Sequence, residues 1–190
     1  MIYRSAKSST VSAKSIWSHT GKRQLPEFIA SVLAATLLDE GTDRPVYFCS
    51  PWISDFPLFE NGFGQFGALF PEEADQRRIA FSDFLVRLSE HSHIRIVTTR
   101  SSTSRSFLAN ARFARTECIQ YRYADDEFHE KGILTPRFYI EGSMNITLHG
   151  VHLRGEKITY HTTFSQDGLA HITAAYLEFD RRWNLLDATD

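Results

Sequence analysis

Four segments of the chain carry apolar residues at the three- and four-residue spacing of an amphipathic helix. This spacing predicts helices over residues 26–38, 74–90, 104–116 and 168–186. Gly41 is expected to end the first helix, and Ser104 is expected to cap the third. In the last helix the apolar positions form one stripe, made of Leu169, Ile172, Tyr176, Phe179 and Trp183.

Between these segments lie short runs rich in β-branched and aromatic residues, which favour strands. They predict strands over residues 45–53, 94–99, 119–123, 128–134, 138–140 and 156–164. The fourth and fifth of these strands are separated by turn-like residues, so we expect a hairpin centred near Pro136. Strands that alternate with helices imply α/β layers, and a hairpin adds antiparallel pairing. The predicted fold is therefore α/β, with a mixed β-sheet flanked by helices.

Residues 55–71 do not follow this alternation and are long for a connection. They contain five phenylalanines interleaved with glycines, namely Phe56, Phe59, Phe63, Phe66 and Phe70. Such a segment could stack on nucleic-acid bases, contact lipid or pack against a partner subunit. The alternative is that its rings simply pack over the core of their own domain.

The chain has 190 residues, of which 42% are hydrophobic, as expected for one soluble globular domain. We assign residues 1–23 to a basic, Ser/Lys-rich segment and residues 24–190 to the domain. No run of eighteen apolar residues exists, and the N-terminus lacks a continuous apolar stretch, so we expect a cytoplasmic protein with no membrane span. Cys49 and Cys118 are expected to be thiols rather than a disulfide or a metal site.

The formal net charge is only −2, but the charges are unevenly placed. Residues 1–26 and 95–115 contain several Lys or Arg residues and no acidic residue, so either stretch could bind a polyanion. Both could equally be a solvated tail or helix face. The acidic run 125–127 would repel a phosphate if it faced the same cleft.

Two short motifs carry the candidate chemistry of the chain. The first is His129-Glu130-Lys131, and the second is Gly142-Ser143-Met144-Asn145. In a strand, His129 and Lys131 would project from one face, because side chains alternate. Counting back from the centre of the hairpin pairs Lys131 with Glu141 and His129 with Ser143. The two motifs are therefore expected to lie side by side.

A phosphate held between the motifs would meet the ammonium of Lys131, the hydroxyl of Ser143 and the amide of Asn145. Its charge could then be neutralised without a metal ion. The other histidines include two pairs, 91/93 and 149/152, whose spacing could ligate zinc, but no acidic or cysteine partner completes either set. We expect neither a metal nor another cofactor.

With these residues the sequence resembles the phospholipase D superfamily, whose signature is H-x-K, an Asp five positions after the Lys, and then G-S-x-N. The resemblance assigns catalytic roles to His129, Lys131 and Asn145, and substrate binding to Gly142 and Ser143. It also implies that Glu156 orients the histidine. The chain departs from the signature at the Asp, where Pro136 stands. Within the superfamily the sequence also resembles DpdK-type members, which are associated with deazapurine DNA modification and phage defence.

The resemblance implies a metal-independent phosphodiesterase, most readily a nuclease, in which His129 forms a phosphohistidine and a second histidine protonates the leaving group. Because the chain contains one H-x-K, the second histidine would come from the partner in a homodimer, or alternatively from His149 or His152. Two other functions stay open. One is phospholipid hydrolysis, with the phenylalanine segment contacting lipid. The other is a catalytically weak module of a defence complex that binds nucleic acid or a partner protein.

Overall fold

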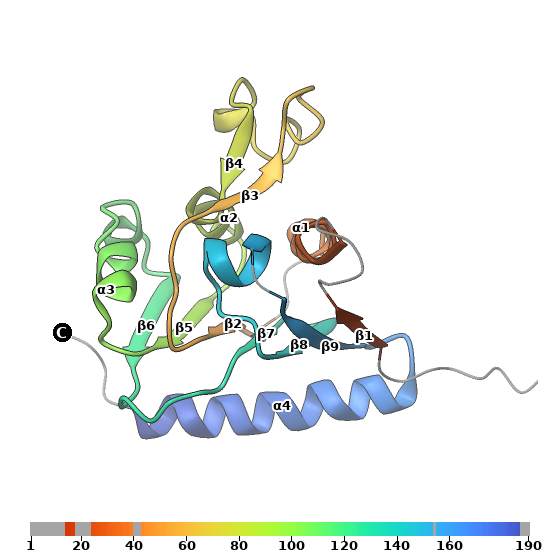
Figure 1. The fold of residues 1–190 in the computed structure, drawn as a ribbon, viewed down its shortest axis with the longest axis vertical. Helices are drawn as coiled ribbons and strands as arrows, with labels where there is room; N and C mark the ends of the chain where they lie inside the picture. The colour runs from red at the N-terminus through yellow and green to blue at the C-terminus, as the bar shows by residue number, and fades with distance from the viewer. Residues whose placement is uncertain (1–13, 18–23, 40–42, 154, 187–190) are drawn as a thin grey trace, which may run out of the picture.

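A seven-stranded mixed β-sheet organises the computed structural model, which describes residues 14–17, 24–39, 43–153 and 155–186 (Figure 1). The strand order is β1-β9-β8-β7-β2-β5-β6. Strands β2, β5 and β6 are parallel, and the other neighbours are antiparallel. The strands are β1 Lys14–Trp17, β2 Val46–Cys49, β5 Ile94–Thr98, β6 Ile119–Tyr123, β7 Gly132–Leu134, β8 Phe138–Gly142 and β9 Lys157–Thr162. The predicted fold class is confirmed.

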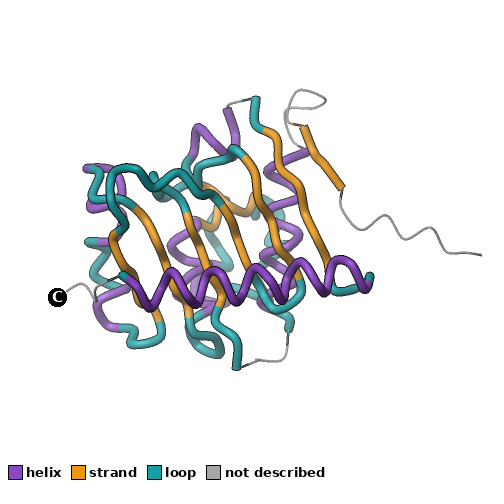
Figure 2. The backbone as a smooth tube through the Cα atoms, turned by 90° about the horizontal axis from the view of Figure 1, so that it is seen from below, coloured by secondary structure: helices purple, strands orange, loops and turns teal. Residues whose placement is uncertain are grey.

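Helices cover both faces of the sheet. The long helix α4 crosses the strands on one face, and the other helices lie on the opposite face (Figures 1 and 2). The helices are α1 Gln24–Leu37, α2 Phe81–Leu88, α3 Ser102–Leu108 and α4 Gln166–Leu185, with short turns η2 Pro71–Glu73, η3 Phe113–Arg115 and η4 His149–Leu153. Alternation along β2 serves both cores, because Val46 and Phe48 face the α1–α3 side whereas Tyr47 and Cys49 face α4.

The stripe predicted on the last helix is buried against the sheet at four of its five positions, the exception being Leu169, which is 49% exposed. Strand β1 lies within the segment 1–23 that the sequence analysis set apart from the domain, and it pairs with β9. The other residues of that segment lie outside the described part of the chain.

The phenylalanine segment mostly packs over its own domain. Strands β3 Pro57–Glu60 and β4 Arg78–Ala80 form a small separate sheet beside α2 (Figure 1). Phe56, Phe59 and Phe70 are buried, and Phe66 packs against the same core. Phe63 is the exception, with 98% of its surface exposed.

The predicted first residues of two helices are wrong. The helix expected over 74–90 begins only at Phe81, because Arg78–Ala80 pairs with β3 and the Asp83 carboxylate accepts a hydrogen bond from the amide of Ala80 (2.8 Å). The helix expected to begin at Ser104 is capped instead by Ser101, whose hydroxyl accepts from the Ser104 amide (3.1 Å).

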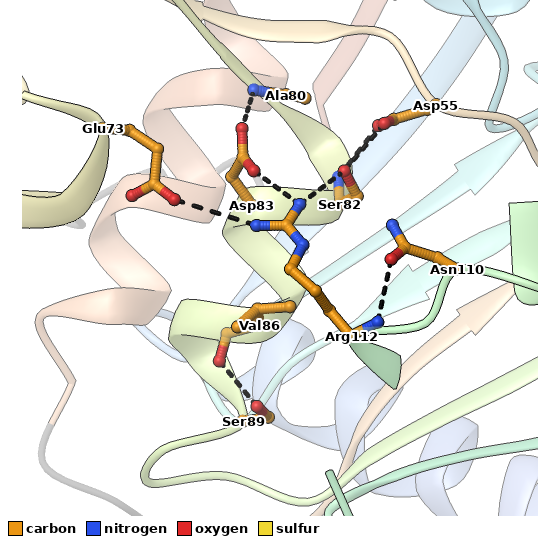
Figure 3. A network of polar contacts seen from close by, with 9 residues as sticks. All are labelled: Asp55, Glu73, Ala80, Ser82, Asp83, Val86, Ser89, Asn110 and Arg112. Carbon is orange, nitrogen blue, oxygen red and sulfur yellow. Dashed lines mark hydrogen bonds and ion pairs between the residues drawn. The ribbon is translucent and has the colours of Figure 1, made fainter. Parts of the chain in front are cut away.

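The acid-free stretch 95–115 is partly occupied by internal ion pairs. Arg112 lies 2.6 Å from Asp83 and 3.2 Å from the Ser82 hydroxyl, and Glu73 lies 3.8 Å away (Figure 3). Arg95 pairs with Asp180 of α4 at 2.9 Å. Because these two arginines form ion pairs within the domain, the stretch is less available to a polyanion than its sequence indicates.

Both cysteines are free thiols. Cys49 is fully buried, and burial raises the pKa of its thiol far above the ordinary value, so it stays protonated near neutral pH. Among the described residues, no helix is both long and apolar enough to cross a membrane.

Candidate active site

The β7–β8 hairpin brings the two motifs together, but one residue out of the expected register. Gly132, not Lys131, pairs with Glu141. The cause is the turn, because the Thr135 amide donates to the Phe138 carbonyl at 2.8 Å and leaves Pro136-Arg137 as the loop. The centre of the hairpin therefore lies after Pro136 rather than on it.

His129 and Lys131 lie just before β7 rather than inside a strand. Lys131 Nζ donates to the carbonyl oxygen of His129 at 2.7 Å. The His129 side chain is exposed, and the described residues give its imidazole no hydrogen-bond partner. Both residues line a solvent-open hollow that Ser143 and Glu141 also line. The structure thus brings the imidazole, the ammonium and the Ser143 hydroxyl to one surface hollow.

Helix α4 holds the residues on either side of His129. Phe128 is buried in the core on the α4 side, and the guanidinium of Arg182 lies 5.5 Å from the centre of its ring. The same guanidinium forms an ion pair with Glu130. One arginine therefore contacts both neighbours of the candidate nucleophile, and no sequence motif marked it.

Gly142 and Ser143 are tied to the beginning of β9. Gly142 has φ 152°, and a Cβ at this position would lie 2.2 Å from the carbonyl oxygen of Lys157, so a larger residue would not fit. The Ser143 hydroxyl donates to the Glu156 carboxylate at 2.5 Å. Glu156 is thus coupled to the Gly-Ser turn, and its expected orienting role toward His129 stays a prediction.

Asn145 does not line the hollow of His129, Lys131 and Ser143. It is 8% exposed and lines a second hollow together with His149 and Trp52. The Ser50 hydroxyl lies 3.3 Å from Asn145 Oδ1 and accepts a hydrogen bond from the Ile146 amide at 3.1 Å. The amide is therefore fixed in place, but it opens into a different hollow from Lys131 and Ser143.

A third hollow shares lining residues with each of the other two. Trp52, Arg100, Asp126, His129 and Lys131 are among the residues that line it. Trp52 belongs to both this hollow and that of Asn145, while His129 and Lys131 belong to both this hollow and that of Ser143. Asp126, from the acidic run 125–127, lines the same hollow as His129 and Lys131. Its carboxylate would repel a phosphate there, as expected for an acidic run that faces the cleft.

The remaining histidines differ in availability. His149 lines the hollow of Asn145, whereas His152 bonds to the Pro57 carbonyl at 3.0 Å and lies edge-on to Phe56. Sequence reasoning did not single out His161, which is buried with its Nε2 3.2 Å from the Glu141 carboxylate. Among the described residues, no three His, Cys, Asp or Glu side chains gather as a metal ion would require.

Known proteins resemble this chain in structure rather than in sequence. No family model and no curated protein matches the sequence. Nuc from Salmonella typhimurium, a phospholipase D family member, is 14% identical with a TM-score of 0.58, over 94% of this chain and 97% of that chain. These values establish the fold, so the predicted phospholipase D-like architecture is confirmed.

Two further solved structures share the fold with different roles. TrmBL2, an archaeal chromatin protein with a novel mode of DNA binding, is 10% identical with a TM-score of 0.52, over 95% of this chain and 55% of that chain. Phosphatidylserine synthase from Haemophilus influenzae is 11% identical with a TM-score of 0.55, over 93% of this chain and 40% of that chain. The fold alone therefore does not select a substrate.

Proposed function

We propose that this chain is a metal-independent phosphodiesterase that acts on nucleic acid as a nuclease. The observation that carries the proposal is the shared hollow of His129, Lys131 and Ser143. It offers the imidazole of His129 as nucleophile and the ammonium of Lys131 to bind the phosphate oxygens, and the Ser143 hydroxyl would turn from Glu156 to donate to them. The similarity of the fold to that of Nuc supports the same chemistry.

The reaction would proceed by two displacements at phosphorus. An imidazole nitrogen of His129 attacks the phosphorus atom, and the bond to the leaving oxygen breaks while a second histidine gives that oxygen a proton. Water then attacks the phosphohistidine while the second histidine takes a proton from it, the phosphorus–nitrogen bond breaks and the free imidazole of His129 returns. Lys131 would neutralise the phosphate throughout, and Asn145 would assist from the neighbouring hollow if the substrate spans both.

Nucleic acid is preferred to lipid because of where the aromatic rings lie. The lipid alternative depended on the phenylalanine segment, yet four of its five rings pack inside the domain. The DNA-binding fold neighbour TrmBL2 supports the same choice, whereas phosphatidylserine synthase keeps the lipid alternative as an outcome to test.

We further propose that the protein acts in the cytoplasm. A role in antiviral defence, with other defence proteins as partners, follows only from the resemblance to DpdK-type sequences. It would be supported if expression of the intact protein, but not of a His129→Ala variant, protected cells from phage.

The second histidine is best supplied by a second copy of the chain. A homodimer with the His129 segment beside a twofold axis would place two imidazoles in one cleft. Such an interface would bury about 1,600 Å² or more in total. His149 is the alternative within the chain, since it lines the adjoining hollow. A monomer in light scattering that cleaves at full rate would favour His149.

The test is a substrate panel in EDTA. Purified protein is incubated with plasmid, single-stranded DNA, RNA and a phosphatidylcholine vesicle, each with and without added Mg²⁺. We expect cleavage of a nucleic acid in EDTA and little stimulation by Mg²⁺, because Lys131 and Ser143 supply the positive and hydrogen-bonding groups that a metal would supply. Strict dependence on the metal, or cleavage of the lipid alone, would contradict the proposal.

A further inference from the structure

Trp52 is an exposed aromatic residue whose backbone segment is held by several hydrogen bonds. Half of its surface is exposed, although its neighbours Pro51 and Ile53 are buried. The Pro51 carbonyl accepts hydrogen bonds from the hydroxyls of Thr98 (3.1 Å) and Thr99 (2.7 Å). The backbone is thus held in place while the indole stays in solvent, so core packing does not explain a large aromatic side chain at this position.

The other side of Trp52 is fixed as well. Ile53 forms a parallel bridge with Ile146, and the Ser54 amide donates to the Ile146 carbonyl at 3.0 Å. The Ser50 hydroxyl donates to the carbonyl of Trp52 itself at 2.7 Å. A rigid aromatic surface loses little conformational freedom when a flat ligand stacks on it.

Trp52 also belongs to two hollows of the candidate site. It lines the hollow of Asn145, and it lines the hollow of about 270 Å³ that His129 and Lys131 also line. A substrate whose phosphate reaches His129 would therefore bring its neighbouring group against Trp52. In a nucleic acid the phosphate is joined to a sugar that carries a base, and the base is the flat group that can stack on an indole.

Arg100 gives the second hollow a positioned cation. Its guanidinium lies 4.6 Å from the centre of the Tyr123 ring, and the residue is exposed. An aromatic surface beside a cation is the combination that binds single strands, since bases stack on the ring while the cation tracks the phosphates. Asp126 lines the same hollow and opposes this attraction, so the stacking contact carries more of the binding.

We infer that Trp52 is the stacking platform for the base next to the cleaved phosphate, and that the substrate is a single-stranded nucleic acid. The inference rests on the proposed function and specifies its substrate. Bases inside a duplex already stack on each other and cannot cover an indole, whereas a base in a single strand is free to do so. Trp52 is thus a substrate-binding residue that no motif indicated.

Binding separates this inference from catalysis. The His129→Ala protein, which cannot turn over substrate, is titrated with a fluorescent single-stranded oligonucleotide, and Trp52→Ala or Trp52→Phe is added to it. We expect Trp52→Ala to weaken binding about tenfold or more and Trp52→Phe to retain most of the affinity. Phe63→Ala is the matched control, because Phe63 is an exposed aromatic outside the three hollows and should leave affinity unchanged.

A second series removes bases instead of the indole. An oligonucleotide is prepared with one abasic residue at successive positions, and the position that contacts Trp52 should weaken binding to the protein that retains Trp52 but not to the Trp52→Ala protein. Equal losses for both proteins at every position, or an affinity for duplex equal to that for single strand, would overturn the inference. If no substrate is cleaved but binding still depends on Trp52, the proposed function fails, and of the inference only the stacking of a single-stranded nucleic acid on Trp52 stands.

Discussion

The two sides of the candidate site are held in different ways. The Trp52 side, residues 50–54, is fixed by hydrogen bonds between its backbone and hydroxyls from β5 and the segment that follows it. Within the described part of the chain, the His129 side, residues 128–131, makes one backbone–backbone hydrogen bond outside the strands, from the Phe128 amide to the Asp125 carbonyl, and otherwise depends on side chains. The proposed binding surface at Trp52 is thus supported by the central strands of the sheet, whereas the position of the candidate nucleophile, His129, depends on contacts with α4.

The two sides should therefore tolerate substitutions to different degrees. Backbone hydrogen bonds survive most changes of side chain, so the Trp52 side should keep its shape when a single residue is replaced. The His129 side should be sensitive to one residue more than fifty positions away, Arg182.

His129→Ala should abolish cleavage of the preferred substrate in EDTA, because it removes the nucleophile. The side chain is exposed, so the melting temperature measured by circular dichroism should not change. His91→Ala is the matched control, since His91 is also exposed and lies outside the site, and it should retain full activity. Full activity in a folded His129→Ala protein would end the enzymatic account.

Lys131→Ala and Asn145→Ala should each lower kcat/KM about a hundredfold, the usual cost of one donor to a developing negative charge. The two variants should differ in stability. Asn145 is buried and lies beside the Ser50 hydroxyl, so its replacement should also lower the free energy of unfolding by about 1 kcal/mol. Replacement of the half-buried Lys131 should not. Urea denaturation of both proteins measures this, and equal stabilities would remove the contrast between the two sides.

Arg182→Ala should lower kcat about tenfold with little change in KM, because it loosens both neighbours of His129 without touching the substrate. Arg182→Lys should recover part of the loss, since an ammonium can still pair with Glu130. Arg181→Ala is the control, because the adjacent Arg181 pairs with Glu178 on the exposed surface of α4. If the two alanine variants behaved alike, Arg182 would have no positioning role.

Glu156→Gln should have the smallest effect, a loss of about fivefold, corresponding to about 1 kcal/mol from one weakened hydrogen bond. The amide oxygen can still accept from the Ser143 hydroxyl, but the side chain no longer carries the negative charge through which Glu156 is expected to orient His129. The pH–rate profile should therefore shift. A profile that superimposes on that of the unmodified protein would contradict an orienting role for Glu156.

The sequence predicted which candidate residues lie together better than it predicted the contacts that support them. Motif spacing placed His129, Lys131 and Ser143 side by side, and they line one hollow because they follow one another along a single hairpin. The register was wrong by one residue, since it depended on which two residues form the turn, and Thr135 decided that by bonding to Phe138. The hydrophobic periodicity of the two strands does not show which two residues form the turn between them.

The tertiary contacts could not be predicted from the sequence, for a different reason. The helical pattern identified α4 and most of its buried face, but nothing in that pattern shows that Arg182 reaches Glu130. Likewise, Ser104 fits the preference for a helix cap, yet it is buried and bonds to Thr98 at 2.8 Å, while Ser101 takes the cap. Both outcomes depend on which elements become neighbours in the folded chain.

The stereochemistry at phosphorus tests the central claim, attack by His129 on a phosphodiester, most directly. A single-stranded substrate with one phosphorothioate of known configuration is cleaved in oxygen-18 water in the presence of EDTA, and the configuration of the product is determined. Two displacements, through a phosphohistidine, each invert the phosphorus, so we predict overall retention. Overall inversion would mean that water attacks the phosphodiester directly, and it would contradict the role assigned to His129.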